Sequence, residues 1–257
     1  MCIRDRGGPK NGSKASLAAF DLETGEKKWE AGNRQASYAS PKYVSICNTG
    51  MILSVNESSV SAHIPQSGRQ IWEHPWQGDS TADANCSQPM VINEDSVMVT
   101  KGYGQGSMLL RLRPVGDSKL RFSSEVVWTN HRALRTKFTN VAVDDDFAYG
   151  LSDGLLQCVN ARSGDIEWKA PPRFGNGQVL GVDQLLLVQS ESGEITLVSL
   201  DTEKFRSLGS FQGLDPDSGA CWNNLCLYGN LLLARNSQEA ACWELPTLED
   251  QNVANGQ

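Results

Sequence analysis

Short runs of hydrophobic residues recur along the chain, and each begins just after a glycine or a polar turn residue. The runs are brief and rich in β-branched and aliphatic side chains, which is typical of buried strands. No stretch keeps the i, i+3, i+4, i+7 spacing of an amphipathic helix, so the pattern predicts an all-β chain with essentially no helix. The runs lie at Met51–Val55, Val97–Val99, Phe147–Tyr149, Leu185–Val188 and Leu231–Ala234.

A second pattern interleaves with these runs and consists of Ser or Thr, then Gly, three further residues and Trp. Asp or Asn starts such a turn by bonding its own backbone, and Gly supplies the positive φ that a tight turn requires. The Trp then lies on the following strand, where its large face can pack between neighbouring sheets. The residues that we predict to carry this repeated structure are Asp21, Gly25, Trp29, Gly68, Trp72, Trp128, Gly164 and Trp168.

The two patterns together define a unit of roughly 40–45 residues with four short strands, which is the length of one β-propeller blade. A helical solenoid has a similar period but needs helices. A β-sandwich is the structural alternative, and it does not explain the repeated turn and Trp. We predict about five blades' worth of chain. Leu17–Glu30 forms the last two strands of a blade, Cys221–Pro246 forms about three strands, and fuller repeats lie near 36–76, 85–130, 136–170 and 176–211.

The two ends of the chain do not match the repeat. Met1–Pro9 shows no strand pattern, and its first six residues resemble a translated sequencing adapter. We therefore expect residues 1–14 to be a non-native or disordered start, 15–246 to form a partial propeller, and 247–257 to be a flexible tail.

Charge and composition narrow the function classes. The 257 residues carry a net charge of −7 with a pI near 5.0, which argues against nucleic acid or an anionic membrane as a partner. No apolar run approaches the length of a membrane span, and no signal peptide is readable. The seven cysteines are not at zinc-ligand spacing. We interpret Cys158 and Cys242 as small buried hydrophobes and leave open a local bridge between Cys221 and Cys226.

The chain also lacks the short motifs of hydrolases, phosphate-binding loops and zinc proteases. The run Asp144–Asp146 contains calcium-type ligands, but its position directly before an apolar strand favours a solvated turn. Gly102–Ser107 resembles a phosphate loop, yet it precedes a strand and is interpreted as a hairpin connection. Trp222 could stack on a planar ring or pack between blades. We predict no metal site.

The repeat resembles that of the pyrroloquinoline-quinone-like β-propeller superfamily, in which Ala-x-Asp-x-x-Thr-Gly-x-x-x-Trp recurs. Ala19–Trp29 matches it closely, and Leu134–Trp168 and Arg235–Pro246 resemble a bacterial subgroup of such repeat proteins. The superfamily includes quinone-dependent alcohol dehydrogenases, a propeller lipoprotein of outer-membrane assembly and many cofactor-free scaffolds. The resemblance implies seven or eight blades, hence an N-terminally truncated chain, and a periplasmic or other extracytoplasmic location. The dehydrogenases use a calcium-bound quinone, an Asp base and often adjacent cysteines, and this chain has no adjacent cysteine pair.

In a propeller, the loops that enter the innermost strands converge at one mouth of the central channel. The corresponding segments here are small or hydrogen-bonding and contain no acid, which suits a peptide, a glycan or ordered water better than acid–base catalysis. Alternatively, these groups satisfy the inner-strand backbone. The candidate binding residues are Tyr38, Ser40, Asn85, Ser87, Gln88, Lys137, Thr139, Asn140, Asn176, Gln178, Trp222 and Asn223.

The sequence thus favours a non-catalytic propeller scaffold, without a cofactor, that binds a protein or an extended polymer at the channel mouth. One alternative is a fragment of a dehydrogenase that uses pyrroloquinoline quinone and calcium. The other is a sensory or glycan-binding module of a longer chain. No oligomeric state is predicted.

Overall fold

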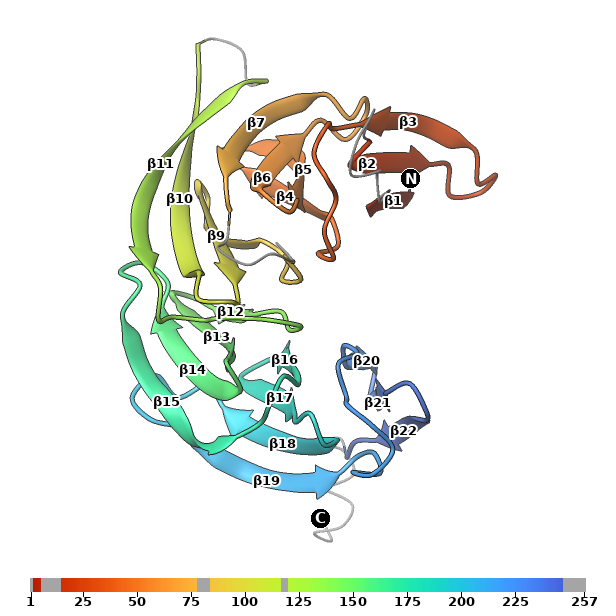
Figure 1. The fold of residues 1–257 in the computed structure, drawn as a ribbon, viewed down its shortest axis with the longest axis vertical. Helices are drawn as coiled ribbons and strands as arrows, with labels where there is room; N and C mark the ends of the chain where they lie inside the picture. Colours follow the sequence, from red (N-terminus) through yellow and green to blue (C-terminus); the bar gives the residue numbers. More distant parts are fainter. Residues whose placement is uncertain (1, 6–14, 78–83, 117–119, 247–257) are drawn as a thin grey trace, which may run out of the picture.

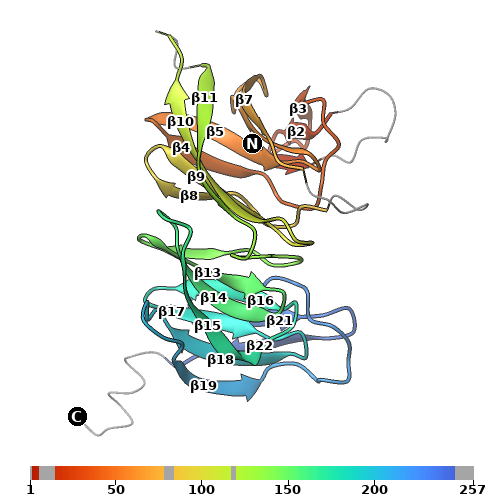
Figure 2. The same cartoon turned by 60° about the vertical axis from the view of Figure 1, so that its left-hand side comes forward.

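The computed structural model describes residues 2–5, 15–77, 84–116 and 120–246, and within these ranges all regular secondary structure is β-strand. The strands form six antiparallel sheets that follow one another in chain order. Figure 1 shows the sheets arranged around an arc, with the first and last sheets at its two ends. In the side view of Figure 2, the sheets of β4–β11 lie above those of β12–β22. The prediction of an all-β chain built from four-stranded antiparallel sheets is confirmed.

Four sheets have four strands, and the two end sheets have three. The first contains β1 (Cys2–Asp5), β2 (Leu17–Phe20) and β3 (Lys27–Ala31). The second contains β4 (Lys42–Ile46), β5 (Thr49–Val55), β6 (Ser59–His63) and β7 (Gln70–Pro75). The third contains β8 (Met90–Asn93), β9 (Ser96–Lys101), β10 (Gly106–Pro114) and β11 (Phe122–Asn130).

The C-terminal half repeats this order. The fourth sheet contains β12 (Ala142–Asp144), β13 (Phe147–Ser152), β14 (Leu155–Asn160) and β15 (Ile166–Arg173). The fifth contains β16 (Gln178–Val182), β17 (Leu185–Gln189), β18 (Glu194–Ser199) and β19 (Ser207–Gln212). The sixth contains β20 (Cys226–Tyr228), β21 (Leu231–Arg235) and β22 (Ala240–Glu244).

Strand β1 corrects the prediction for the N-terminus. The pattern predicts no strand in Met1–Pro9, but Cys2–Asp5 pair antiparallel with Leu17–Phe20. The exposed edge of a sheet offers unpaired N–H and C=O groups to any extended segment, so pairing there does not require the side-chain pattern of the repeat. Residues 1, 6–14 and 247–257 lie outside the described ranges, and the predicted domain boundaries therefore stay predictions.

The hydrophobic runs found in the sequence form the second strand of each sheet from the second onward, in β5, β9, β13, β17 and β21. Figure 1 places β7, β11, β15 and β19 on the outer rim, whereas β12, β16 and β20 face the centre of the arc. The first strand of each of these sheets is therefore its inner edge. The segment that precedes it therefore lies toward the centre of the arc.

The hydrophobic core lies between neighbouring sheets. Met98 and Leu109 of the third sheet, for example, share a buried cluster with Ala148 and Val159 of the fourth. Similar clusters join the second sheet to the third, the fourth to the fifth, and the fifth to the sixth. Each sheet thus buries its faces against its neighbours in the chain, because a single four-stranded sheet cannot cover its own apolar faces.

The repeated Trp connects its sheet to the next one at three of the junctions. The indole nitrogen of Trp29 donates to the carbonyl oxygen of Pro65 at 3.0 Å. The indole nitrogen of Trp128 donates to the carbonyl oxygen of Ala161 at 3.0 Å. The indole nitrogen of Trp168 donates to the carbonyl oxygen of Asp201 at 2.8 Å. Each acceptor lies in the hairpin turn of the following sheet, which gives the repeated turn and the repeated Trp a common structural role.

Trp72 shows what happens where the next sheet lacks this turn. The third sheet has no Ser/Thr-Gly hairpin; its outer strands β10 and β11 are nine residues long. Trp72 is 4% exposed, and its indole nitrogen has no hydrogen-bond partner among the described residues. It packs instead in the core with Leu112 and Phe122. The Trp72 ring is thus buried, but among the described residues it lacks the hydrogen bond to the next sheet that the other repeated Trp rings form.

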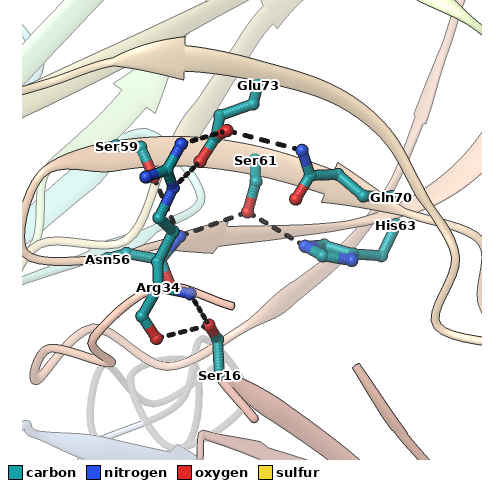
Figure 3. Close-up of polar contacts among 8 residues, drawn as sticks. All are labelled: Ser16, Arg34, Asn56, Ser59, Ser61, His63, Gln70 and Glu73. Carbon is teal, nitrogen blue, oxygen red and sulfur yellow. Dashed lines mark hydrogen bonds and ion pairs between the residues drawn. The ribbon is translucent and has the colours of Figure 1, made fainter. Parts of the chain in front are cut away.

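A polar network, exposed at Arg34 and buried at His63, fixes the second sheet to the segment after β3 (Figure 3). Arg34 donates from Nε and Nη2 to the two carboxylate oxygens of Glu73, at 2.7 and 2.9 Å. This bidentate contact holds the pKa of Glu73 below its usual value. Deeper in the sheet, His63 is 1% exposed. Its Nδ1 lies 2.9 Å from the Gly68 carbonyl, which only accepts, so Nδ1 carries the proton and Nε2 accepts from Ser61 at 2.9 Å.

We expect His63 to make the fold acid-sensitive. Burial lowers the pKa of His63, although the Gly68 carbonyl and Glu73 oppose that shift, so the unfolded chain takes up a proton more readily than the folded one. The free energy of unfolding should therefore decrease as the pH falls below about 6.5, the ordinary value for histidine. His74, whose pKa burial also lowers, contributes with the same sign.

Urea unfolding at about pH 7.5 and about pH 5 would measure this effect. The fall in stability should be smaller in His63→Gln than in the wild type, and unchanged in His131→Gln, which alters an exposed histidine. Equal pH dependence in His63→Gln and the wild type would contradict the assignment.

Candidate binding site at the channel mouth

The segments that precede the first strands meet around one hollow. It has a volume of about 690 Å³ and is lined by Tyr38, Ala84, Cys86, Tyr103, Phe138, Asn140, Trp222, Asn223 and Asn224. We call it the mouth pocket. Its lining comes from the segments before β4, β8, β12 and β20 and from the turn between β9 and β10. Four of the candidate residues, Tyr38, Asn140, Trp222 and Asn223, therefore lie together.

Aromatic rings dominate the exposed part of the pocket. Tyr38 is 78% exposed and Trp222 is 49% exposed, so Trp222 does not pack between blades, which was the alternative considered from the sequence. The ring of Phe138 lies 4.9 Å from that of Trp222, centroid to centroid. Tyr103 and Phe138 were not singled out from the sequence. The Gly102–Ser107 connection joins two strands, as predicted. Tyr103 lies in this connection, and that position is the sequence feature that points to it.

The predicted amides and hydroxyls instead lie mostly inside the structure. Asn85 is 1% exposed, and its Nδ2 donates to the carbonyl of Asn56 at 2.6 Å and to that of Glu57 at 3.2 Å. Its own carbonyl accepts from the backbone N–H groups of Tyr38 and Ala39, both at 2.9 Å. Asn85 thereby links the segment that precedes β8 of the third sheet to the second sheet and to the segment that precedes it.

Ser87 and Gln88 connect the third sheet to the fourth in the same way. The hydroxyl of Ser87 contacts the carbonyl of Thr139 at 2.5 Å, and the backbone N–H of Gln88 donates to Oδ1 of Asn140 at 2.9 Å. Thr139 is 2% exposed. The side chain of Gln88 reaches the carbonyl of the exposed Ser40 at 3.4 Å.

Gln178 spans the fourth, fifth and sixth sheets. It is 1% exposed, and its Nε2 donates to the carbonyls of Phe138 and Trp222, both at 2.7 Å. These two bonds place Phe138 and Trp222, two of the four aromatic residues of the mouth pocket, side by side. The buried Gln178 thus fixes the backbone of two residues that line the pocket.

Among the residues that the structure describes, the acid Glu191 reaches the pocket, although no acid lies in the predicted segments. Glu191, in the connection between β17 and β18, accepts from the indole nitrogen of Trp222 at 2.7 Å and from the backbone N–H of Asn176 at 3.1 Å. Burial alone would raise the pKa of Glu191, but these hydrogen bonds outweigh burial and lower it. The carboxylate is therefore ionised at neutral pH and holds Trp222 in place. The backbone of Asn176 makes this contact.

Lys137 lies beside the pocket but is engaged elsewhere. Its ammonium forms an ion pair with Asp153 at 3.4 Å. The same ammonium lies 5.9 Å from the ring centroid of Tyr103, which is a cation–π distance.

The donor set does not fit a calcium-bound quinone. Asp144–Asp146 lie at the hairpin between β12 and β13, where Asp145 has a φ of 46° and Asp146 forms an ion pair with Arg162. In the described part of the chain, no group of three or more His, Cys, Asp or Glu side chains is placed to hold a metal ion. Trp222 has Glu191 beside it, but that carboxylate is occupied by two N–H donors.

The structure tests the candidate disulfide bridge and the predicted burial of two cysteines. Cys221 and Cys226 are both free thiols, so the local bridge that was left open is not formed. Cys158 is buried as predicted, but Cys242 is exposed, which corrects its interpretation as a buried hydrophobe. The face of the sixth sheet that carries Cys242 has no described segment packed over it.

The hydrogen bonds of Asn85 predict that its replacement costs stability. Asn85→Ala leaves two buried carbonyls without their donor, and we expect a loss of about 1–3 kcal/mol in the free energy of unfolding. Asn223→Ala, at the half-buried rim of the pocket, is the matched control and should change stability by less than about 0.5 kcal/mol. Urea denaturation of both variants tests this, and equal losses would show that Asn85 has no special structural role.

Comparison with known proteins gives the family. A family model described as "Outer membrane protein assembly factor BamB" matches residues 9–170. The chain belongs to this family. The resemblance to pyrroloquinoline-quinone-like propeller repeats is thereby confirmed, and the chain is a BamB-like repeat propeller. No curated protein sequence matches it.

Solved structures support the same fold. The crystal structure of BamB from Moraxella catarrhalis is 14% identical with a TM-score of 0.52, over 88% of this chain and 77% of that one. A chain of a mitotic checkpoint complex is 12% identical with a TM-score of 0.62, over 89% and 68% of the two chains. At these identities the matches show the β-propeller fold alone. Within the described residues of the BamB-like chain, no helix is long and apolar enough to cross a membrane.

Proposed function

We propose that this BamB-like chain is a non-catalytic scaffold that binds a protein at its channel mouth during outer-membrane protein assembly. The observation that carries the proposal is the mouth pocket, where connections from four sheets converge on one hollow of about 690 Å³. The printed description of the family, an outer membrane protein assembly factor, supports a protein as the partner. The family also supports a location outside the cytoplasm, at the periplasmic side of the outer membrane.

Site-specific crosslinking tests where the protein binds. A benzophenone amino acid would replace Tyr38, which is 78% exposed in the pocket, or Tyr228, which is 80% exposed on β20 and outside the pocket. Each purified variant would be irradiated with an unfolded outer-membrane β-barrel protein freshly diluted from urea. We expect crosslinks from position 38 and few from position 228. Equal crosslinking at both positions, or none at position 38, would refute the proposal.

A dehydrogenase would behave differently. The purified chain, incubated with pyrroloquinoline quinone and calcium and then dialysed, should retain no stoichiometric quinone absorbance, because the residues described at the mouth hold no cluster of metal-binding side chains. It should also show no dye-linked alcohol oxidation. Stoichiometric retention would favour the enzyme over the scaffold.

A further inference from the structure

The four rings of the mouth pocket come from four different sheets. Tyr38 precedes β4, Tyr103 lies between β9 and β10, Phe138 precedes β12, and Trp222 precedes β20. Rings distributed in this way face a ligand that extends across the mouth.

Trp222 and Phe138 are held in place before any ligand arrives. Nε1 of Trp222 donates to Glu191 at 2.7 Å, and Nε2 of Gln178 holds the carbonyls of both Trp222 and Phe138 at 2.7 Å. The two rings are tilted by 35° with their centroids 4.9 Å apart. Since these contacts already fix the rings, little side-chain entropy remains to be lost when a ligand binds.

Among the residues that the structure describes, the lining of the pocket is aromatic, amide and small. Lys137, beside the pocket, forms an ion pair with Asp153 at 3.4 Å. The carboxylate of Glu191 accepts from the N–H groups of Trp222 and Asn176, and its negative charge beside Trp222 disfavours an acidic ligand group there. The part of the ligand that enters the pocket should therefore carry no acidic side chain.

The amides match the chemistry of a peptide backbone. Asn223 offers one carbonyl and one NH₂ group, which complement the N–H and C=O of a peptide unit, and Asn224 adds its NH₂ group. Asn140 is already engaged, because its Oδ1 accepts from the backbone N–H of Gln88 and its Nδ2 donates to Oδ1 of Asn224 at 3.5 Å. A sugar ring carries hydroxyls on all sides, and each one that is buried needs its own partner. The few amide groups left in the lining favour a peptide over a glycan.

From this geometry we propose that the mouth pocket binds an extended peptide segment, free of acidic side chains, through an aromatic side chain of that segment, with Trp222 as the principal contact. The ring of the ligand packs against Trp222 and Phe138, and the amides of Asn223 and Asn224 bond its backbone. This inference rests on the proposed function and names the kind of sequence that the site selects.

Calorimetric titration of the whole chain tests the inference. The probe is the blocked heptapeptide acetyl-Gly-Ser-Phe-Thr-Tyr-Ser-Gly-amide, and its comparison peptide has Lys in place of Phe and Tyr. We expect saturable binding of the aromatic peptide only. Trp222→Ala should weaken it at least about tenfold, as for a buried aromatic anchor. Tyr228→Ala removes a more exposed ring, 80% against 49% for Trp222, that lies outside the pocket, and it should leave the affinity unchanged.

Three results would overturn the inference. They are equal binding of the lysine peptide, unchanged affinity in Trp222→Ala, and binding of maltohexaose but not of the aromatic peptide. Trp222→Phe, which keeps a ring, guards against a folding defect and should bind with intermediate affinity. If crosslinking from position 38 persists while the peptide result fails, the proposed function stands and only the ligand class is wrong. If that crosslinking is also absent, both fail.

Discussion

Trp168→Ala should lower the free energy of unfolding by about 3–5 kcal/mol, the usual cost of deleting a large buried aromatic side chain. Trp168 is 8% exposed and packs against Tyr149 and Phe205, with ring centroids 6.1 and 6.0 Å away. Its indole nitrogen also donates to the carbonyl of Asp201 in the fifth sheet. The substitution thus removes packing within the fourth sheet and a contact to the next sheet together.

Trp168→Phe separates these two contributions. It keeps a ring in the core but loses the hydrogen bond to Asp201, so we expect a smaller loss of about 1–2 kcal/mol. Equilibrium unfolding in urea, followed by far-ultraviolet circular dichroism, would measure both variants. A loss below about 1.5 kcal/mol for Trp168→Ala would mean that the repeated Trp does not hold neighbouring sheets together.

Gly68→Ala should destabilise the protein far more than Gly25→Ala, although the two glycines occupy equivalent turns. Both have a left-handed backbone, with φ of 70° and 73°, so alanine costs about 1–2 kcal/mol at either site. At Gly68 a new Cβ would also lie 2.6 Å from Cε3 of Trp29, whereas at Gly25 nothing lies within 4 Å. The resulting displacement of the indole should add about 1–3 kcal/mol.

The difference in the free energy of unfolding between Gly68→Ala and Gly25→Ala measures how closely a Trp packs on the turn of the next sheet. Gly164→Ala is a further replicate, because a Cβ there would lie 2.7 Å from Cδ2 of Trp128. The same urea assay serves for all three proteins. Equal losses at positions 25 and 68 would leave only the backbone conformation as the reason for glycine in the repeat.

The sequence predicts the turns and the strand order because both depend on neighbouring residues. Asp21 illustrates this, since its Oδ1 accepts from the backbone N–H groups of Glu23 and Thr24, both at 3.0 Å. These bonds and the ion pair with Lys28 lower the pKa of Asp21 to about 2. All of the partners lie within seven residues, so a local motif contains the whole interaction.

The mouth pocket is only partly predictable for the opposite reason. The pattern finds the segments that enter the inner strands, but it does not say which side chains turn outward. Asn85 and Gln178 turn inward because backbone carbonyls of other sheets lie in reach. Glu191 comes from a connection between later strands and meets Trp222 only through the tertiary structure.

Cys242 shows a second limit of reasoning from one strand. It pairs with Leu233 as Cys158 pairs with Tyr149, so the two cysteines occupy corresponding places in their sheets. Cys158 is covered by its own Trp168 and by the fifth sheet. Cys242 is exposed, because burial at this position depends on the neighbouring layer and cannot be read from the strand itself.

The order of the sheets along the arc has a consequence for how the molecule loses structure. Among the six described sheets, each interior sheet has two neighbours along the arc and each end sheet has one, so loss of structure should spread from one sheet to the next. Amide hydrogen exchange of this chain should then show a gradient of protection, slowest in β9 and β13 and fastest in β2 and β21. A further sheet packed on either end would flatten that gradient.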